Sequence, residues 1–123
     1  MSNFTVFDIP SFADERGILS VIEDGVLPFS AVRIYWITGA SDQTRGGHRH
    51  RKTRQALISI QGEVSIFLDN GEYEKTITLS TPNQYLLVEP EDWHTMTFGP
   101  NSILLVIASH TYSIDDYVDA KYD

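Results

Sequence analysis

The sequence predicts an all-β protein with a single domain, residues 1–123, folded as an antiparallel sandwich or a small barrel. Two observations carry this prediction. Short segments rich in β-branched and aromatic residues recur about every ten residues along the chain. Residues typical of turns, such as Gln61-Gly62 and Thr81-Pro82-Asn83, separate these segments.

The expected strands follow one another closely. They are Phe4–Ile9, Gly17–Glu23, Val32–Thr38, Ala56–Ile60, Glu63–Leu68, Tyr73–Leu79, Tyr85–Val88 and Ile103–Ala108. A further strand is expected to begin near Trp93-His94.

Two local motifs refine the expected elements. Asp69-Asn70-Gly71 predicts a hairpin with a type I′ turn, because Asn-Gly accepts the positive φ angles of that turn. Ser113-Ile114-Asp115-Asp116 resembles a capping box, which predicts a short C-terminal helix through about Ala120.

Composition excludes several classes of protein. Nine Lys and Arg residues against seventeen Asp and Glu residues give a net charge of −8, which argues against a general nucleic-acid coat or a binder of anionic membranes. The absence of cysteine excludes disulfides, thiolate zinc sites and cysteine nucleophiles. Without a long apolar run or a signal-like start, the sequence predicts a soluble, cytoplasmic domain.

Basic residues cluster in one segment of this acidic chain. The cluster comprises Arg45, Arg49, Arg51, Lys52 and Arg54. Concentrated positive potential suits a small anionic ligand. The alternative interpretation is a solvated strand edge, where Lys and Arg protect against aggregation.

The His48-Arg49-His50 segment lies inside this cluster. On a strand, both imidazoles point to one face and Arg49 points to the other. Gly46-Gly47 precedes them and allows a tight bend or a close approach to a ligand. The alternative is a pair of core histidines satisfied by hydrogen bonds.

Residues from Gly46 to His94 resemble the cupin motif, Gly…His-x-His…Glu…Gly followed by a later histidine. In metal-binding cupins, these histidines and the glutamate hold a divalent ion. Here Gln55 stands in place of the glutamate, and a neutral amide makes a weaker site for such a cation. We therefore expect no metal, and a metal-dependent, dioxygenase-like cupin is the alternative.

A second strand offers two possible inward faces. Arg33 and Tyr35 share one face of the expected strand Val32–Thr38, and Trp36 lies on the other. Either Arg33 and Tyr35 line a polar cleft, or Trp36 fills the barrel. Periodicity leaves both open.

The segments Arg33–Ile37, Arg45–Lys52 and Glu89–His94 together resemble the nucleotide-linked sugar 3,4-ketoisomerases. These are small, metal-independent cupins with a jelly-roll barrel that act on TDP-4-keto-6-deoxyglucose in deoxysugar biosynthesis, as for O-antigen and lipopolysaccharide. The resemblance implies no cofactor and a homodimer, and it allows exchange of the N-terminal strand Phe4–Ile9. A sugar-nucleotide 3,5-epimerase and a non-enzymatic sugar-binding cupin remain alternatives.

The chemistry of such an isomerisation assigns roles to the residues. Imidazole has a pKa of about 6.5 and can accept and return a proton near neutral pH, so His48 and His50 are the expected catalytic bases. Tyr35 and Arg45 are expected to stabilise the developing oxyanion. The expected substrate-binding residues are Arg33, Arg54, Arg51, Lys52, Arg16, Gly47 and His94. The configuration of the product at C4, the division of roles between the histidines and the ring that stacks on thymine stay open.

Overall fold

A computed structural model describes residues 3–122, which form two five-stranded antiparallel sheets and one separate hairpin. The first sheet has the order β1 (Val6–Asp8), β9 (Gln84–Val88), β6 (Gln55–Gln61), β11 (Ile103–Ala108) and β4 (Arg33–Ile37). The second has the order β12 (Tyr117–Val118), β5 (Thr44–His50), β10 (Trp93–Phe98), β7 (Val64–Asp69) and β8 (Glu74–Leu79). Strands β2 (Ser11–Asp14) and β3 (Gly17–Ser20) pair only with each other among the described residues.

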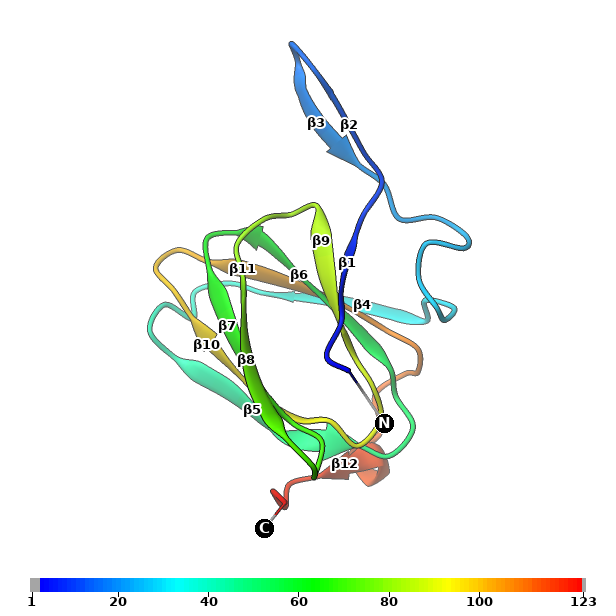
Figure 1. Cartoon of the computed structure of the whole chain (residues 1–123), viewed down its shortest axis with the longest axis vertical. Helices are drawn as coiled ribbons and strands as arrows, with labels where there is room; N and C mark the ends of the chain where they lie inside the picture. Colours follow the sequence, from blue (N-terminus) through cyan, green and yellow to red (C-terminus); the bar gives the residue numbers. More distant parts are fainter. Residues whose placement is uncertain (1–2, 123) are drawn as a thin grey trace.

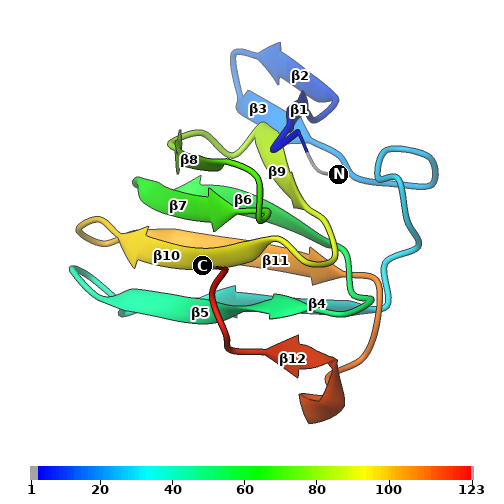
Figure 2. The same ribbon diagram turned by 60° about the horizontal axis from the view of Figure 1, so that its bottom comes forward.

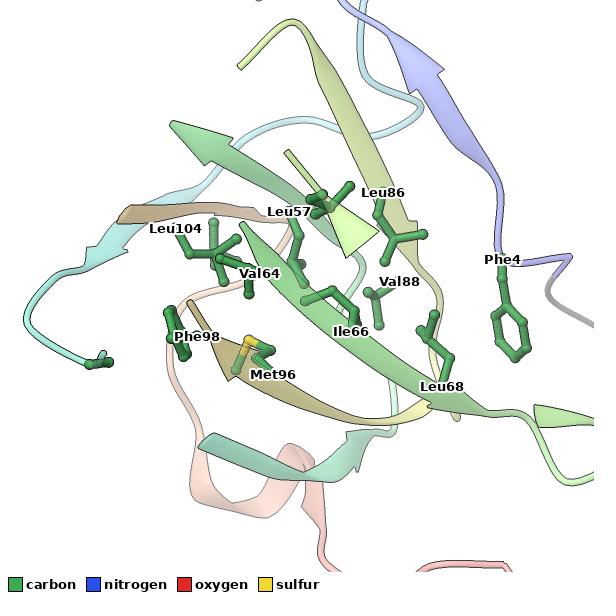
Figure 3. Packing of buried hydrophobic residues seen from close by; sticks show 13 residues of the cluster. Phe4, Leu57, Val64, Ile66, Leu68, Leu86, Val88, Met96, Phe98 and Leu104 are labelled. Atoms are coloured by element: carbon green, nitrogen blue, oxygen red, sulfur yellow. The ribbon is translucent and has the colours of Figure 1, made fainter. Parts of the chain in front are cut away.

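The main core fills the space between the two sheets (Figure 3). Alternate residues Val64, Ile66 and Leu68 of β7 are fully buried, and they meet Leu57 and Leu86 from the first sheet. This is the period-two pattern of a strand with one apolar face. Burying each such side chain contributes about 1.5–3 kcal/mol. The core therefore holds the two sheets together and leaves one end of the sandwich for polar side chains.

A smaller core lies on the outer face of the first sheet. Ala56 and Ile58 of β6 point away from the main core, and they pack with Leu27, Ile22 and Phe29. The long connection between β3 and β4 therefore covers this outer face.

The expected all-β antiparallel barrel is confirmed, and so are the expected strands in their central residues. The N-terminal part differs. Gly17–Glu23 is a strand only as far as Ser20, and its partner Ser11–Asp14 was not expected from the sequence. The resulting β2–β3 hairpin projects from the barrel (Figure 1).

The expected C-terminal helix is reduced to a single 3₁₀ turn, η1 (Ile114–Asp116). The extension to about Ala120 is wrong, because the chain continues as β12 and pairs with β5 (Figure 2). Ser113 makes no side-chain cap hydrogen bond to a described residue. The capping-box pattern fails because the buried Asp116 carboxylate bonds to His50 of β5 and to the Lys52 backbone just after that strand.

The hairpin between β7 and β8 is confirmed, but its type I′ turn is wrong. Among the described residues Gly71 has a positive φ and Asn70 does not. The connection spans residues 70–73, where the Asn70 side chain accepts hydrogen bonds from the backbone of Glu72 and Tyr73. No helix among residues 3–122 has the length and apolar character needed to cross a membrane.

Candidate active site

A polar cleft of about 540 Å³ opens between β4 and β5. It is lined by Arg33, Tyr35, Trp36, Ile37, Arg45, Gly46, His48, Met96 and Tyr117. Arg33 and Tyr35 are half-buried on the inner face of β4, whereas the Trp36 side chain is 66% exposed. The structure therefore selects the polar-cleft alternative for this strand.

A bulge in β5 places His48 at the cleft. His48 pairs with His94, but the next partner of β10, Thr95, pairs with Gly46, so Gly47 is the extra residue. Gly46 and Gly47 have φ angles of +88° and +84°. A Cβ atom at Gly46 would lie 2.9 Å from the His94 carbonyl oxygen. Glycine at position 46 is therefore required for the two strands to approach this closely.

Three imidazole rings and one phenol gather beside the cleft. The His48 and His50 ring centroids are 5.0 Å apart, and the His48 and His94 centroids are 5.2 Å apart. The Tyr117 ring lies 4.5 Å from His48 and 4.6 Å from His50. The expected pairing of His48 and His50 on one face of a strand is confirmed by this contact.

Burial keeps these imidazoles neutral near pH 7. Burial, followed by the nearby His50, lowers the pKa of His48 to about 4. Burial lowers the pKa of His94 to about 4 as well. For His50, burial lowers the pKa by more than the hydrogen bond and charge of Asp116 raise it. Neutral imidazoles carry an unprotonated nitrogen, so each of these rings can accept a proton.

His50 is held by a carboxylate that the sequence analysis did not identify. Its Nδ1 lies 2.8 Å from Oδ2 of Asp116, and both residues are buried. The backbone N–H of Lys52 and the hydroxyl of Thr53 also donate to Asp116. Asp116 is therefore held in place by two donors, and its carboxylate in turn orients the His50 ring through Nδ1.

The Tyr35 phenol is oriented by Gln55. The Gln55 side-chain amide donates a hydrogen bond to the Tyr35 oxygen at 3.2 Å, and Gln55 itself is buried. Burial raises the pKa of Tyr35, so the phenol keeps its proton at neutral pH. The Arg33 guanidinium lies 4.4 Å from the Tyr35 ring centroid. The phenol can therefore donate its proton to a negative oxygen in the cleft.

Most of the basic cluster lies away from the cleft. Arg54 donates to Glu89 and to the Pro28 carbonyl, and its side chain lies outside the cleft in the described chain. Arg51 bonds to the Asp115 carbonyl. Lys52 is exposed, and Arg16 pairs with Asp14 at the tip of the β2–β3 hairpin.

Of the predicted cations, Arg33 and Arg45 line the cleft. The expected substrate-binding residues Arg54, Arg51, Lys52 and Arg16 do not line this cleft in the described part of the chain. Arg54 precedes the inward-facing Gln55, so strand alternation turns it outward.

Three further expected site residues do not line the cleft in the described part of the chain. His94 is 2% exposed and contacts the Asp92 carbonyl through Nδ1 at 3.0 Å. The other two are Gly47 and His50, and His50 is 3% exposed and reaches the cleft side through its contact with His48. No group of three or more His, Asp or Glu residues within residues 3–122 is arranged to hold a metal ion.

The structure adds Tyr117 and Asp116 to the site. Asp116 is the last residue of the segment whose sequence predicts the first turn of a helix, and Tyr117 follows it directly. The pairing of Tyr117 with His50 joins two segments that lie far apart in the sequence, and no local pattern indicates such a register.

Comparisons with known proteins agree on one family. A model of the FdtA family, described as WxcM-like, C-terminal, matches residues 2–123. The chain is 36% identical over 121 residues to a TDP-4-oxo-6-deoxy-α-D-glucose-3,4-oxoisomerase from Aneurinibacillus thermoaerophilus, covering 96% of this chain and 86% of the relative.

Solved structures of sugar 3,4-ketoisomerases share the fold. QdtA from Thermoanaerobacterium thermosaccharolyticum, in complex with TDP, is 37% identical with a TM-score of 0.91, covering 96% of this chain and 88% of that one. A histidine-to-asparagine variant of QdtA, in complex with TDP-4-keto-6-deoxyglucose, is 36% identical with a TM-score of 0.92, covering 98% and 89%.

Proposed function

The chain belongs to the FdtA family and is a sugar-nucleotide 3,4-ketoisomerase, and we propose that His48 and His50 carry its proton transfers at the cleft between β4 and β5. Its substrate is TDP-4-keto-6-deoxyglucose and its product a TDP-3-keto-6-deoxyhexose. The observation that supports the site is the contact of two neutral imidazoles, 5.0 Å apart, beside a phenol and two guanidinium groups.

The reaction moves a carbonyl from C4 to C3 through an enediolate. A base removes the proton on C3, the C3–H electron pair forms the C3=C4 double bond, and the carbonyl electron pair moves to O4. A proton then moves from O3 to O4. Collapse of the second enolate forms the C3 carbonyl, and C4 takes up a proton. The substrate oxidises one carbon and reduces its neighbour.

We assign to His48 the removal of the proton from C3 and the delivery of a proton to C4, because His48 lines the cleft directly. His50 lies beside it with Asp116 behind the ring, and we assign to it the transfer between the two oxygens. A correctly placed general base contributes about 10²–10⁴ in rate.

The developing oxyanion needs hydrogen-bond donors. Tyr35 keeps its proton, and Gln55 occupies a lone pair of its oxygen, so the phenolic O–H is free to donate toward O4. Arg45 is the second donor, as the sequence analysis expected.

We propose that Arg33 and Arg45 also attract the diphosphate, because they are the predicted cations that line the cleft. A guanidinium binds phosphate oxygens in a bidentate manner. Arg54 is already paired with Glu89, so its charge is neutralised locally.

Isotope labelling tests this function against the alternatives. Purified protein is incubated in D₂O with TDP-4-keto-6-deoxyglucose, and the product is followed by NMR. Deuterium at C4 of a 3-keto product supports the isomerase, and the H4–H5 coupling of the product formed in H₂O reports the C4 configuration. Deuterium at C5 would indicate a 3,5-epimerase. Loss of turnover on removal of a stoichiometric metal would indicate a metal-dependent cupin.

We further propose that the protein is a homodimer acting in the cytoplasm. Phe12, Ile18 and Leu19 of the projecting β2–β3 hairpin are 64%, 70% and 63% exposed, which is unusual for three neighbouring apolar side chains. A second copy would cover them. In the described chain β1 pairs with β9 of its own molecule, and exchange of β1 between copies would keep the same pairing.

Light scattering after size-exclusion chromatography tests the dimer. The wild-type protein should have twice the chain mass, and Leu19→Asp should shift it toward the monomer. A wild-type monomer at all concentrations would contradict this part of the proposal.

A further inference from the structure

Asp116 is a buried carboxylate that the reaction described above does not use. Its side chain is 4% exposed, although it belongs to a surface 3₁₀ turn near the C-terminus. An isolated ionised carboxylate is costly to bury unless hydrogen bonds compensate. The partners of Asp116 therefore indicate why the chain keeps a carboxylate here.

Three groups surround the Asp116 carboxylate, and all of them come from the segment that follows the bulge in β5. The Lys52 backbone N–H donates to Oδ1 at 2.8 Å, and the Thr53 hydroxyl donates to Oδ2. The third is His50 Nδ1, at 2.8 Å from Oδ2. Burial raises the pKa of Asp116, but these hydrogen bonds outweigh it and lower the pKa overall. Asp116 is thus an anion at neutral pH.

An ionised carboxylate can only accept hydrogen bonds. The short contact with His50 therefore requires the proton of the neutral imidazole to sit on Nδ1. The opposite nitrogen, Nε2, is buried and has no hydrogen-bond partner within residues 3–122. It is left as an unprotonated acceptor on the side of the ring away from Asp116.

The C-terminal segment fixes this geometry through its backbone. Tyr117 pairs with His50 in the β12–β5 ladder, and the Arg51 N–H donates to the Asp116 carbonyl at 2.8 Å. The backbone and the side chain of Asp116 thus both bind the end of β5. The ring of His50 has little freedom to rotate or to exchange its tautomer.

We infer that Asp116 is a positioning residue for the isomerase, which fixes His50 as the Nδ1–H tautomer and so presents Nε2 as the proton acceptor. This inference rests on the proposed function of His50. Asp116 itself touches no reacting atom. It acts through the imidazole, as a buried carboxylate does in other histidine-dependent enzymes.

The variant Asp116→Asn tests the inference, with Asp115→Asn as the matched control. Asp115 precedes Asp116 on the same turn and is exposed, so its substitution removes the same charge without touching His50. An asparagine at position 116 can present its amide N–H to Nδ1, which favours the Nε2–H tautomer of His50. The kcat should fall by about 10²–10⁴ while KM changes little. Asp115→Asn should keep the wild-type kcat.

Imidazole ¹⁵N chemical shifts provide a readout that a structural role alone would not change. The His50 signals, identified by their loss in His50→Asn, should show a protonated Nδ1 and an unprotonated Nε2 in the wild type at pH 7. In Asp116→Asn the proton should move to Nε2. The double variant His50→Asn with Asp116→Asn should be no slower than His50→Asn alone, because both changes remove the same function.

The outcomes distinguish a failure of the inference about Asp116 from a failure of the proposed function. A wild-type His50 protonated on Nε2 would overturn the inference even if Asp116→Asn failed to fold. So would wild-type kcat in a folded Asp116→Asn, or additive losses in the double variant. A wild type with the expected tautomer but no activity on TDP-4-keto-6-deoxyglucose would instead contradict the proposed function and leave the role of Asp116 toward His50 intact.

Discussion

Gln55 donates its side-chain amide to the phenol oxygen of Tyr35 at 3.2 Å, from the strand position where metal-binding cupins carry glutamate. Both side chains are turned inward from the first sheet, one from β6 and one from β4. The amide therefore has a role of its own: it occupies the oxygen of Tyr35 and leaves the phenolic proton available. This relationship connects the departure from the cupin motif to the chemistry of the cleft.

Replacing Gln55 with glutamate should impair catalysis. A carboxylate at this position would accept the Tyr35 proton, so the phenol could no longer donate to the oxyanion. We expect kcat to fall by about 10²–10³ with the fold retained, in line with the loss of one oxyanion donor. Steady-state kinetics of Gln55→Glu, with Tyr35→Phe measured in parallel, checks this. Unchanged kcat in Gln55→Glu would show that the Tyr35 proton is not used.

Substitution of Arg33 or Arg45, which line the cleft, should weaken substrate binding, whereas substitution of Arg54 should not. Arg33→Gln and Arg45→Gln should raise KM about 10–100-fold, because each removes a charge-assisted hydrogen bond to the diphosphate. Arg45→Gln should also lower kcat, because Arg45 is the proposed second donor to the oxyanion. Arg54→Gln is the matched control, since Arg54 is paired with Glu89 outside the cleft. If Arg54→Gln raised KM and the other two variants did not, the diphosphate would bind at Arg54 and the cleft assignment would be wrong.

The free energy of unfolding should decrease as the pH is lowered from about 6.5 to about 4. In the folded protein, the pKa values of His48 and His94 are each about 4, well below the usual value of about 6.5. Between these limits the unfolded chain binds more protons, so the free energy of unfolding falls as the pH drops from about 6.5 toward 4. Urea unfolding midpoints across this range measure the effect.

His94→Gln provides the comparison for this pH dependence. Without the buried imidazole, the urea midpoint should change less steeply between pH 6.5 and 4. A wild-type midpoint that stays constant over that interval would contradict the lowered pKa values.

Gly46→Ala should destabilise the bulge in β5 more than Gly47→Ala does. Both positions have positive φ, which costs an L-residue about 1–3 kcal/mol. The Cβ at Gly46 would also lie 2.9 Å from a backbone oxygen, whereas the nearest atom to a Cβ at Gly47 is a Trp93 ring carbon at 4.0 Å. Thermal unfolding of the two variants compares them. Equal losses would show that the strands can move apart at no cost.

Local sequence patterns predict much of this site. Period-two alternation correctly paired His48 with His50, and it correctly grouped Arg33 with Tyr35. The Gly46-Gly47 pair predicts a special backbone conformation, and in the structure both glycines have positive φ and β10 lies against them. These features depend on neighbours within a few residues, so the sequence alone contains them.

Long-range partners account for what was missed. Asp116 lies 66 residues from His50, and the β12–β5 register that joins them has no local signal. The position of Arg54 outside the cleft has the same cause. Its partner Glu89 is 35 residues away, and a cluster of basic residues in the sequence does not show which carboxylates neutralise it. The acidic turn before β12 has the sequence of a helix start, because an Asp at this position can either begin a helix or, as Asp116 does, bind a distant side chain.

The turnover of His48→Asn and His50→Asn tests the central claim most directly. Each variant, checked for folding by circular dichroism, is given TDP-4-keto-6-deoxyglucose, and formation of the 3-keto product is followed by NMR. We predict that kcat falls by at least about 10²-fold in both, because each imidazole moves a proton that the other cannot. Folded variants that both isomerise the substrate at the wild-type rate would contradict the account.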